Sequence, residues 1–282
     1  MLKLRLLIFF WLTVLGGFNA CTDTVEIEFP EHQPHPVINA FFTPDSVWKV
    51  DITTSKSLRW EESYDTIRNA TIEIFEGEQR VDSLLYQGGS TYRSGRGHRP
   101  EEGKEYTLRF SAPGYANCTA TDRVPTLPKM DLLRIDTVAA NSLFYISGEK
   151  IVVTIRIDDR LEPNYYYTYI FDKDDGDLSF QNSYHSPPIN YIEFGSRSVF
   201  SDQAFNGIEY SLSFDYENFR DETTFINIGI VSEDYFRFAQ DYEKHLYDQL
   251  EFLATPEDVY SNIEGGFGIF AGYYSLTFVV SQ

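Results

Sequence analysis

Short runs of alternating apolar and polar residues, separated by turn residues, fill the first part of the chain after its N-terminal leader. Residues 70–76 (ATIEIFE) alternate in this way and end at Gly77, as a strand buried on one face does. Two more β-rich runs, 37–42 and 48–53, flank a Thr-Pro-Asp-Ser turn signal and predict a hairpin. About seven such strands in some 90 residues are typical of a sandwich. We therefore predict an immunoglobulin-like or transthyretin-like β-sandwich over residues 36–125.

A different pattern begins after a proline-rich joint at 124–128 (VPTLP), which is stiff and lacks two backbone donors. New strand-like runs follow it at 151–157, 165–171, 209–214, 224–231 and 273–280. Between 232 and 250, however, apolar residues recur at helical spacing after Ser232, a residue type that caps helices. We predict a second, β-rich domain over residues 126–282 with one amphipathic helix near 232–250. The fold class predicted for the whole chain is mainly β.

Composition and charge narrow the class of protein. The chain has 282 residues, of which 42% are hydrophobic and 16% aromatic, so it folds despite a formal net charge of −20. Without its leader it keeps about 260 residues, enough for two hydrophobic cores. Its negative charge would repel a phosphate backbone, which excludes nucleic acid as a partner.

The first residues have the order of an export signal. Lys3 and Arg5 precede an apolar run that is too short for a comfortable transmembrane helix, and a small residue follows just before Cys21. We predict a signal peptide over residues 1–20. Ala20-Cys21 resembles the lipobox of bacterial lipoproteins, although Phe18 stands where that box usually has Leu. An ordinary signal peptide followed by a chance cysteine is the alternative.

Acylation of Cys21 would change how the rest of the chain is stabilised. Residues 21–35 would form an acylated N-terminus and tether, and the two or three acyl chains of a lipoprotein would anchor it stably in a membrane. Cys118 would then have no intramolecular partner, so burial rather than a disulfide must stabilise the fold. We expect Cys118 to pack as a small apolar side chain.

Motifs in both halves of the chain resemble one family. They lie at 37–44 (VINAFFTP), 69–74 (NATIEI), 103–108 (GKEYTL), 114–115 (GY), 164–166 (NYY), 200–207 (FSDQAFNG) and 260–270 (YSNIEGGFGIF). Because these motifs follow one another in this order along the chain, the chain resembles the Bacteroidota lipoproteins catalogued as the domain of unknown function DUF4249. This resemblance implies an outer-membrane lipoprotein, commonly encoded beside a TonB-dependent transporter. It supplies no catalytic residue and no cofactor.

Acidic residues directly after Cys21 are similar to the signal by which these bacteria export lipoproteins to the outer face of the outer membrane. The residues are Asp23, Glu26 and Glu28. We expect the anchored chain to be exposed at the cell surface.

One triplet occurs five times: an Asp, followed by Ser or Thr, followed by an apolar residue. It resembles the O-glycosylation acceptor of the same bacteria. The hydroxyl residues of these triplets are Thr24, Ser46, Thr66, Ser83 and Thr137. Composition alone would give about one or two such triplets. The alternatives are a glycosylated N-terminal half and coincidence in a sequence rich in Asp and Thr.

Groups that could bind a metal or catalyse a reaction are poorly arranged. The carboxylates of 172–177 (DKDDGD) suggest calcium, but their spacing departs from the EF-hand loop, and Asp175-Gly176 is a good hairpin signal. The five histidines are scattered, no G-x-S-x-G is present, and adjacent carboxylates on a strand point to opposite faces. We expect neither a metal site nor an enzyme.

Two features remain open on sequence grounds. Tyr165, Tyr167 and Tyr169 lie on one face of a strand, where they could bind a ligand or partner, unless the strand is simply buried on both sides. Residues 265–268 (GGFG) could permit a bulge or tight turn, or the close approach of another backbone.

These observations favour a non-enzymatic accessory of a TonB-dependent transporter, which captures substrate or stabilises the transporter. A structural or adhesive surface protein is the alternative. A surface glycan or peptide hydrolase is less favoured, because it would need converging carboxylates or an activated nucleophile.

Overall fold

The computed structural model describes residues 32–57, 64–139, 149–174, 177–181, 184–185, 191–194, 197–216, 223–248 and 259–280. The chain divides into two units, Met1–Gln33 and Pro34–Gln282. The fold described below is that of the second unit. The predicted signal peptide, Cys21, Thr24 and the acidic residues after Cys21 lie outside the described residues.

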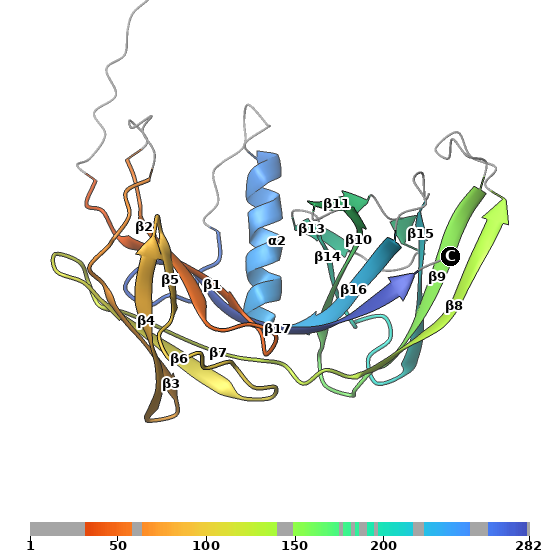
Figure 1. The fold of residues 1–282 in the computed structure, drawn as a ribbon, viewed down its shortest axis with the longest axis horizontal. Helices are drawn as coiled ribbons and strands as arrows, with labels where there is room; N and C mark the ends of the chain where they lie inside the picture. The colour runs from red at the N-terminus through yellow and green to blue at the C-terminus, as the bar shows by residue number, and fades with distance from the viewer. Residues whose placement is uncertain are drawn as a thin grey trace, which may run out of the picture. The chain divides into compact units, whose positions relative to one another are not determined.

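The fold is mainly β, as the sequence predicts (Figure 1). In chain order the elements are β1 Pro36–Phe42, β2 Lys49–Thr54, β3 Thr71–Glu76, β4 Gln79–Gly88, β5 Thr91–Ser94, β6 Glu105–Ser111, β7 Cys118–Arg123, β8 Lys129–Ala139, β9 Glu149–Asp158, β10 Tyr165–Asp174, β11 Asp177–Gln181, β12 Tyr184–His185, β13 Tyr191–Phe194, β14 Arg197–Ser201, β15 Glu209–Tyr216, β16 Thr223–Val231, α2 Glu233–Asp248 and β17 Phe267–Val280.

The seven strands predicted in the first part of the chain are present as β1 to β7. They form one antiparallel path in the order β1-β2-β5-β4-β3-β6-β7, and the predicted hairpin joins β1 to β2. Alternation gives these strands one buried face: on β3, Ile72 and Ile74 are fully buried, whereas Thr71 is exposed. One hydrophobic core, which includes Trp48 and Tyr106, is formed by side chains from these strands together with Ile263 and Phe270 from the end of the chain.

β17 continues this sheet into the second part of the chain. Its first half pairs in parallel with β1, from Phe267 to Gly272, and its second half pairs antiparallel with β16, from Tyr273 to Val280. The result is a 13-stranded sheet in which the last strand of the chain lies beside the first. The sequence predicts a strand at 273–280 but not this pairing.

A second core lies between this sheet and a four-stranded sheet, β12-β15-β9-β8. Side chains at alternate positions of β10 and β16, such as Tyr166 and Ile228, face this core and meet Val153 and Phe214 of the other sheet. β10 is therefore packed on both of its faces, because its remaining side chains meet α2.

The predicted helix is α2, which covers the opposite face of the 13-stranded sheet and contacts β13, β14 and β17 (Figure 1). The Ser232 side chain caps it, since the backbone N–H of Tyr235 donates to Ser232 Oγ at 3.2 Å. Tyr235 and Ala239 are at most 1% exposed and pack with Val199, Val231 and Ile269. No helix among the described residues is long and apolar enough to span a membrane.

The proposed boundary near residue 125 falls between β7, in the 13-stranded sheet, and β8, in the four-stranded sheet. Residues Pro34–Gln282 nevertheless form one compact unit. The division into two domains stays a prediction.

Candidate functional site

A polar cavity of about 430 Å³ lies beside the N-terminus of α2. We call it the N-cap pocket. It is lined by Gly103 and by three segments, residues 122–126 at the end of β7 and just after it, 162–165 at the start of β10, and 230–234 at the junction of β16 and α2. The pocket thus forms where the joint between the halves of the sequence meets the helix cap.

Asp122 is the central carboxylate of the N-cap pocket. Its Oδ2 accepts a hydrogen bond from the backbone N–H of Gly272 at 2.8 Å, and the Ser232 hydroxyl donates to the same carboxylate. Burial raises the pKa of Asp122 to about 7, and the charge of Asp234 adds to this effect. One side chain therefore links β7, β17 and the cap of α2.

The backbone around Gly272 is closely packed. A Cβ at this position would lie 2.1 Å from the carbonyl oxygen of Arg123, so only glycine lets β17 pass β7 at this distance. The carbonyl of Gly272 accepts from the N–H of Ser232 at 2.9 Å. The start of α2 is thus fixed to β17 by backbone as well as side-chain bonds.

Asp234, in the first turn of α2, holds the segment that leads into β17. Its two carboxylate oxygens accept from Tyr260 Oη at 2.6 Å and from Asn262 Nδ2 at 2.8 Å. Asn262 also accepts from the N–H of Phe270 and donates to the Phe270 carbonyl. Burial and the nearby Asp234 raise the pKa of Tyr260 to about 12. Two of the pocket's carboxylates, Asp122 and Asp234, are therefore committed to structural hydrogen bonds.

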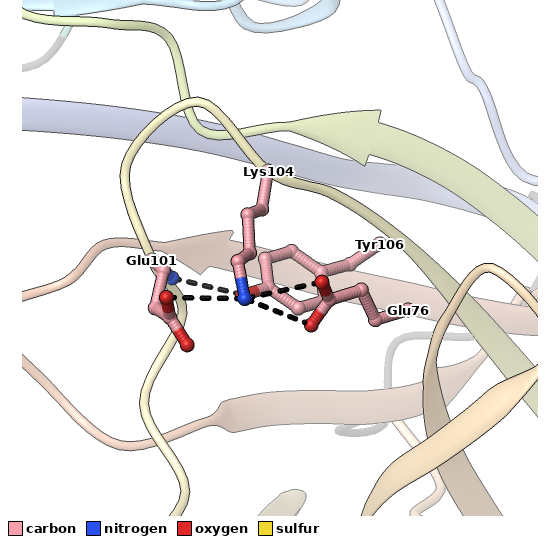
Figure 2. A network of polar contacts seen from close by, with 4 residues as sticks. All are labelled: Glu76, Glu101, Lys104 and Tyr106. Carbon is pink, nitrogen blue, oxygen red and sulfur yellow. Dashed lines mark hydrogen bonds and ion pairs between the residues drawn. The ribbon is translucent and has the colours of Figure 1, made fainter.

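The motif at 103–108 forms another edge of the N-cap pocket. Figure 2 shows Lys104 Nζ between the carboxylates of Glu101 and Glu76, each at 3.1 Å. The N–H of Glu101 donates to Tyr106 Oη at 2.9 Å. These contacts hold the turn in which Gly103 adopts φ +75° and donates its N–H to the Val124 carbonyl.

The motifs at 164–166 and 200–207 meet through two buried carboxylates. Asp202 Oδ2 accepts from the N–H of Asn164 at 2.7 Å, next to the pocket. Asp159 accepts from Tyr166 Oη and, at 2.7 Å, from the N–H of Gly207. These motif residues hold turns in place rather than presenting reactive groups to solvent.

The three tyrosines predicted as one surface have different surroundings. Tyr165 lines the N-cap pocket and stacks on Phe236 of α2, with ring centroids 4.6 Å apart. Tyr167 is 3% exposed and packs under α2, and Tyr169 is half-buried and stacks on Tyr167. Of the three, Tyr165 alone reaches the pocket.

The glycosylation-like positions also differ in exposure. Ser46, in the turn after β1, and Thr137, on β8, are exposed. Thr66 and Ser83 are half-buried, and the aspartate that precedes Ser83 is 1% exposed and accepts from the N–H of Ser83.

Cys118 and the glycine-rich segment behave as parts of the core. Cys118 is 3% exposed, and burial raises the pKa of its thiol, which confirms that it packs as a small apolar side chain. Gly265 and Gly268 have φ of +84° and +109°, and a Cβ on Gly268 would lie 2.0 Å from the carbonyl oxygen of Ile38. Both predicted roles therefore occur in this segment: a tight turn of the backbone, and the close approach of another strand.

The carboxylate cluster at 172–177 lies where β10 and β11 pair, with Asp174 opposite Asp177. Asp175 and Gly176 lie outside the described residues. Elsewhere in the part of the chain that the structure describes, no group of His, Cys, Asp and Glu side chains could hold a metal ion.

Sequence reasoning missed Asp122 as a site residue, although a signal was present. In β7 the inward positions are Cys118 and Ala120, and the same alternation places Asp122 on their face. A carboxylate at an inward position of a strand indicates a buried polar contact.

The fold and the N-cap pocket define a mainly β protein with a polar cavity held by a helix cap. The chain belongs to the family described as "Domain of unknown function (DUF4249)", whose model matches residues 22–277. No curated protein matches it. Among solved structures, it is similar to the collagen binding domain of the Erysipelothrix rhusiopathiae surface protein RspB, at 8% identity over 86% of this chain and 96% of that chain. The TM-score of 0.18 is too low to support an argument about fold or function.

Proposed function

We propose that this protein is a lipid-anchored, surface-exposed binding protein of the outer membrane and a non-enzymatic accessory of a TonB-dependent transporter. It would either capture a small polar solute for the transporter or stabilise the transporter itself. The proposal rests on the order of Lys3, Arg5, the apolar run and Cys21, and on the resemblance that accompanies it.

The observation that carries the binding role is the way the N-cap pocket uses its polar groups. Asp122 and Asp234 accept structural hydrogen bonds, and the pocket's serine, Ser232, caps α2 and donates to Asp122. A hydrolase needs a nucleophile beside a base, or two carboxylates flanking the scissile bond. Fixed hydrogen-bonding groups around a cavity suit recognition instead.

The charge of the N-cap pocket limits the kinds of solute that it would bind. Four carboxylates, those of Asp122, Glu162, Glu233 and Asp234, line it together with one arginine, Arg123. An acidic cavity favours neutral or positively charged solutes. The ring of Tyr165 adds an apolar face on which a sugar or another flat group could stack.

A structural or adhesive surface protein is the alternative. It would need the same anchor, but it would have no stable association with a transporter and no need of a solute pocket.

Co-purification tests the transporter role. The tagged chain would be extracted from its native membranes in mild detergent, and associated proteins would be quantified by mass spectrometry. We expect a TonB-dependent barrel to be enriched with the wild type and lost with Cys21→Ser, which should leave the membrane fraction or accumulate as precursor. Recovery of the chain alone under several growth conditions would count against the accessory role and favour the structural alternative.

A further inference from the structure

Arg197, the first residue of β14, lies under α2 in a group of four tyrosines that we call the tyrosine cage. The cage consists of Tyr167 and Tyr169 on β10, Tyr235 on α2 and Tyr273 on β17. The guanidinium carbon lies 5.8 Å from the ring centroid of Tyr167 and 5.6 Å from that of Tyr169. Arg197 Nη1 donates to Tyr235 Oη at 3.3 Å.

The charge of Arg197 is not balanced by an acidic group in the described part of the chain. Other cations there, such as Lys150 and Arg156, form ion pairs with carboxylates. Among the described residues, the strongest electrostatic influence on Arg197 comes from the phenols of Tyr235, Tyr167 and Tyr273. A half-buried guanidinium with no carboxylate partner among the described residues is unusual in a chain with a formal net charge of −20.

The phenols of the cage are neutral hydrogen-bonding groups. Burial raises the pKa values of Tyr167, Tyr169, Tyr235 and Tyr273, so none of them becomes a phenolate that would balance Arg197 at neutral pH. A guanidinium has five N–H donors in a planar fork, and the bond to Tyr235 uses one of them.

The surroundings of Arg197 are partly open. Tyr169, Tyr273 and Arg197 itself are half-buried, whereas Tyr167 and Tyr235 are at most 3% exposed. Beyond them on the same sheet face, Asn227 Nδ2 donates to Ser275 Oγ at 3.3 Å and to Thr277 Oγ1 at 2.8 Å. A cationic fork with aromatic sides and polar neighbours has the composition of a binding site.

We propose that Arg197 and the tyrosine cage bind a carboxylate carried on a flat ring, either an aromatic acid or a sugar acid. The guanidinium would pair with the carboxylate, and the half-buried rings of Tyr169 and Tyr273 would contact the ring of the ligand. The ring is part of the proposal because the overall negative charge repels small free anions, so contact with the tyrosines must add to the affinity. This site is separate from the N-cap pocket and does not depend on the transporter role.

Two matched pairs of probes test the proposal by calorimetry on the full chain. Benzoate is compared with benzamide, and galacturonate with galactose, so that each pair differs in its carboxylate. We expect one acid to bind, and its uncharged partner to bind at least about tenfold more weakly. The two pairs distinguish an aromatic acid from a sugar acid.

Variants assign the binding to Arg197. Arg197→Met should weaken binding of the acid at least about thirtyfold, because the partner charge is lost. Arg197→Lys, which keeps the charge but loses the planar fork, should weaken it about tenfold. Tyr273→Leu removes the aromatic ring that would contact the ligand and should weaken binding of the acid several-fold, so the test survives if Arg197→Met misfolds.

The outcomes that would overturn the proposal are equally definite. Absence of binding by both acids at about 10 mM, a concentration at which even weak millimolar binding would be detected, would show that Arg197 only packs against the rings. Equal binding of the acids and their uncharged partners, or unchanged affinity in folded Arg197→Met or Arg197→Lys, would do the same.

Discussion

At the scale of single residues, Asp122 gives the fold a pH dependence with a definite sign. Its pKa is about 7 in the folded chain, against an ordinary value of 3.8, so the folded state holds the proton more tightly than the unfolded state. The stability that this group contributes is complete below about pH 4 and is lost as the pH rises through 7.

Asp122→Asn should remove this dependence. The amide oxygen can still accept from the N–H of Gly272, and the amide N–H can donate to Ser232, but no charge appears at high pH. The melting temperature of the variant, measured relative to that of the wild type from pH 4 to pH 8, should therefore increase as the pH rises. A constant difference between the two proteins across this range would show that Asp122 does not titrate as described.

Gly272 tests the contact between β7 and β17. In Gly272→Ala the new Cβ would meet the Arg123 carbonyl, so the strands must move apart, and we expect a loss of about 3 kcal/mol in the free energy of unfolding. Gly77→Ala is the control: its space is open, and its φ of +57° costs about 1 kcal/mol. Urea unfolding measures both, and equal losses would contradict the close approach.

At the scale of elements, the Ser232 cap of α2 makes one contact within the helix and one tertiary contact, to Asp122. Ser232→Ala removes the bond to the N–H of Tyr235, worth about 1 kcal/mol, and the donor to Asp122 as well. We expect a loss of about 2 kcal/mol in unfolding free energy, since both contacts are broken. Ser211→Ala, at an exposed position on β15, should change little. A loss no larger than that of the control would rule out the cap.

Local patterns predicted elements well where one signal dominated. Alternation identified β3, and helical spacing after Ser232 identified α2. β8 was missed because Lys, Asp and Arg interrupt its apolar positions, and it is an exposed strand with a single partner, β9. The parallel pairing of β1 with β17 could not be predicted either, since it joins residues more than 200 positions apart and no local signal encodes it.

The candidate site shows the same limit. Tyr165 was selected because aromatic residues cluster in its strand, but its place in the N-cap pocket depends on α2 and on the joint after β7. The alternation of β7 turns Asp122 inward, but its partners Gly272 and Ser232 follow much later in the chain. Arg197 looks like an ordinary surface charge in the sequence, and its surroundings come from β10, α2 and β17, so tertiary packing decides the chemistry of both residues.

At the scale of the whole molecule, exposure separates the glycosylation-like positions. A glycosylating enzyme that acts on the folded chain would reach Ser46 and Thr137 more readily than Thr66 and Ser83. We expect an intact mass above that of polypeptide plus lipid, which falls when Ser46 and Thr137 are both changed to alanine. A wild-type mass equal to polypeptide plus lipid would end this prediction.

The proposed function depends on one chemical fact about the whole molecule, namely how its N-terminus is processed. Anchoring at Cys21 would hold the chain at a membrane surface, and without it the accessory role has no basis.

Mass spectrometry of the N-terminal peptide of the protein from native membranes tests this most directly. We predict a peptide that begins at Cys21 and carries a diacylglycerol on its thiol together with any further acyl chain. A peptide that begins at any other residue, or one with an unmodified Cys21, would contradict the lipoprotein account.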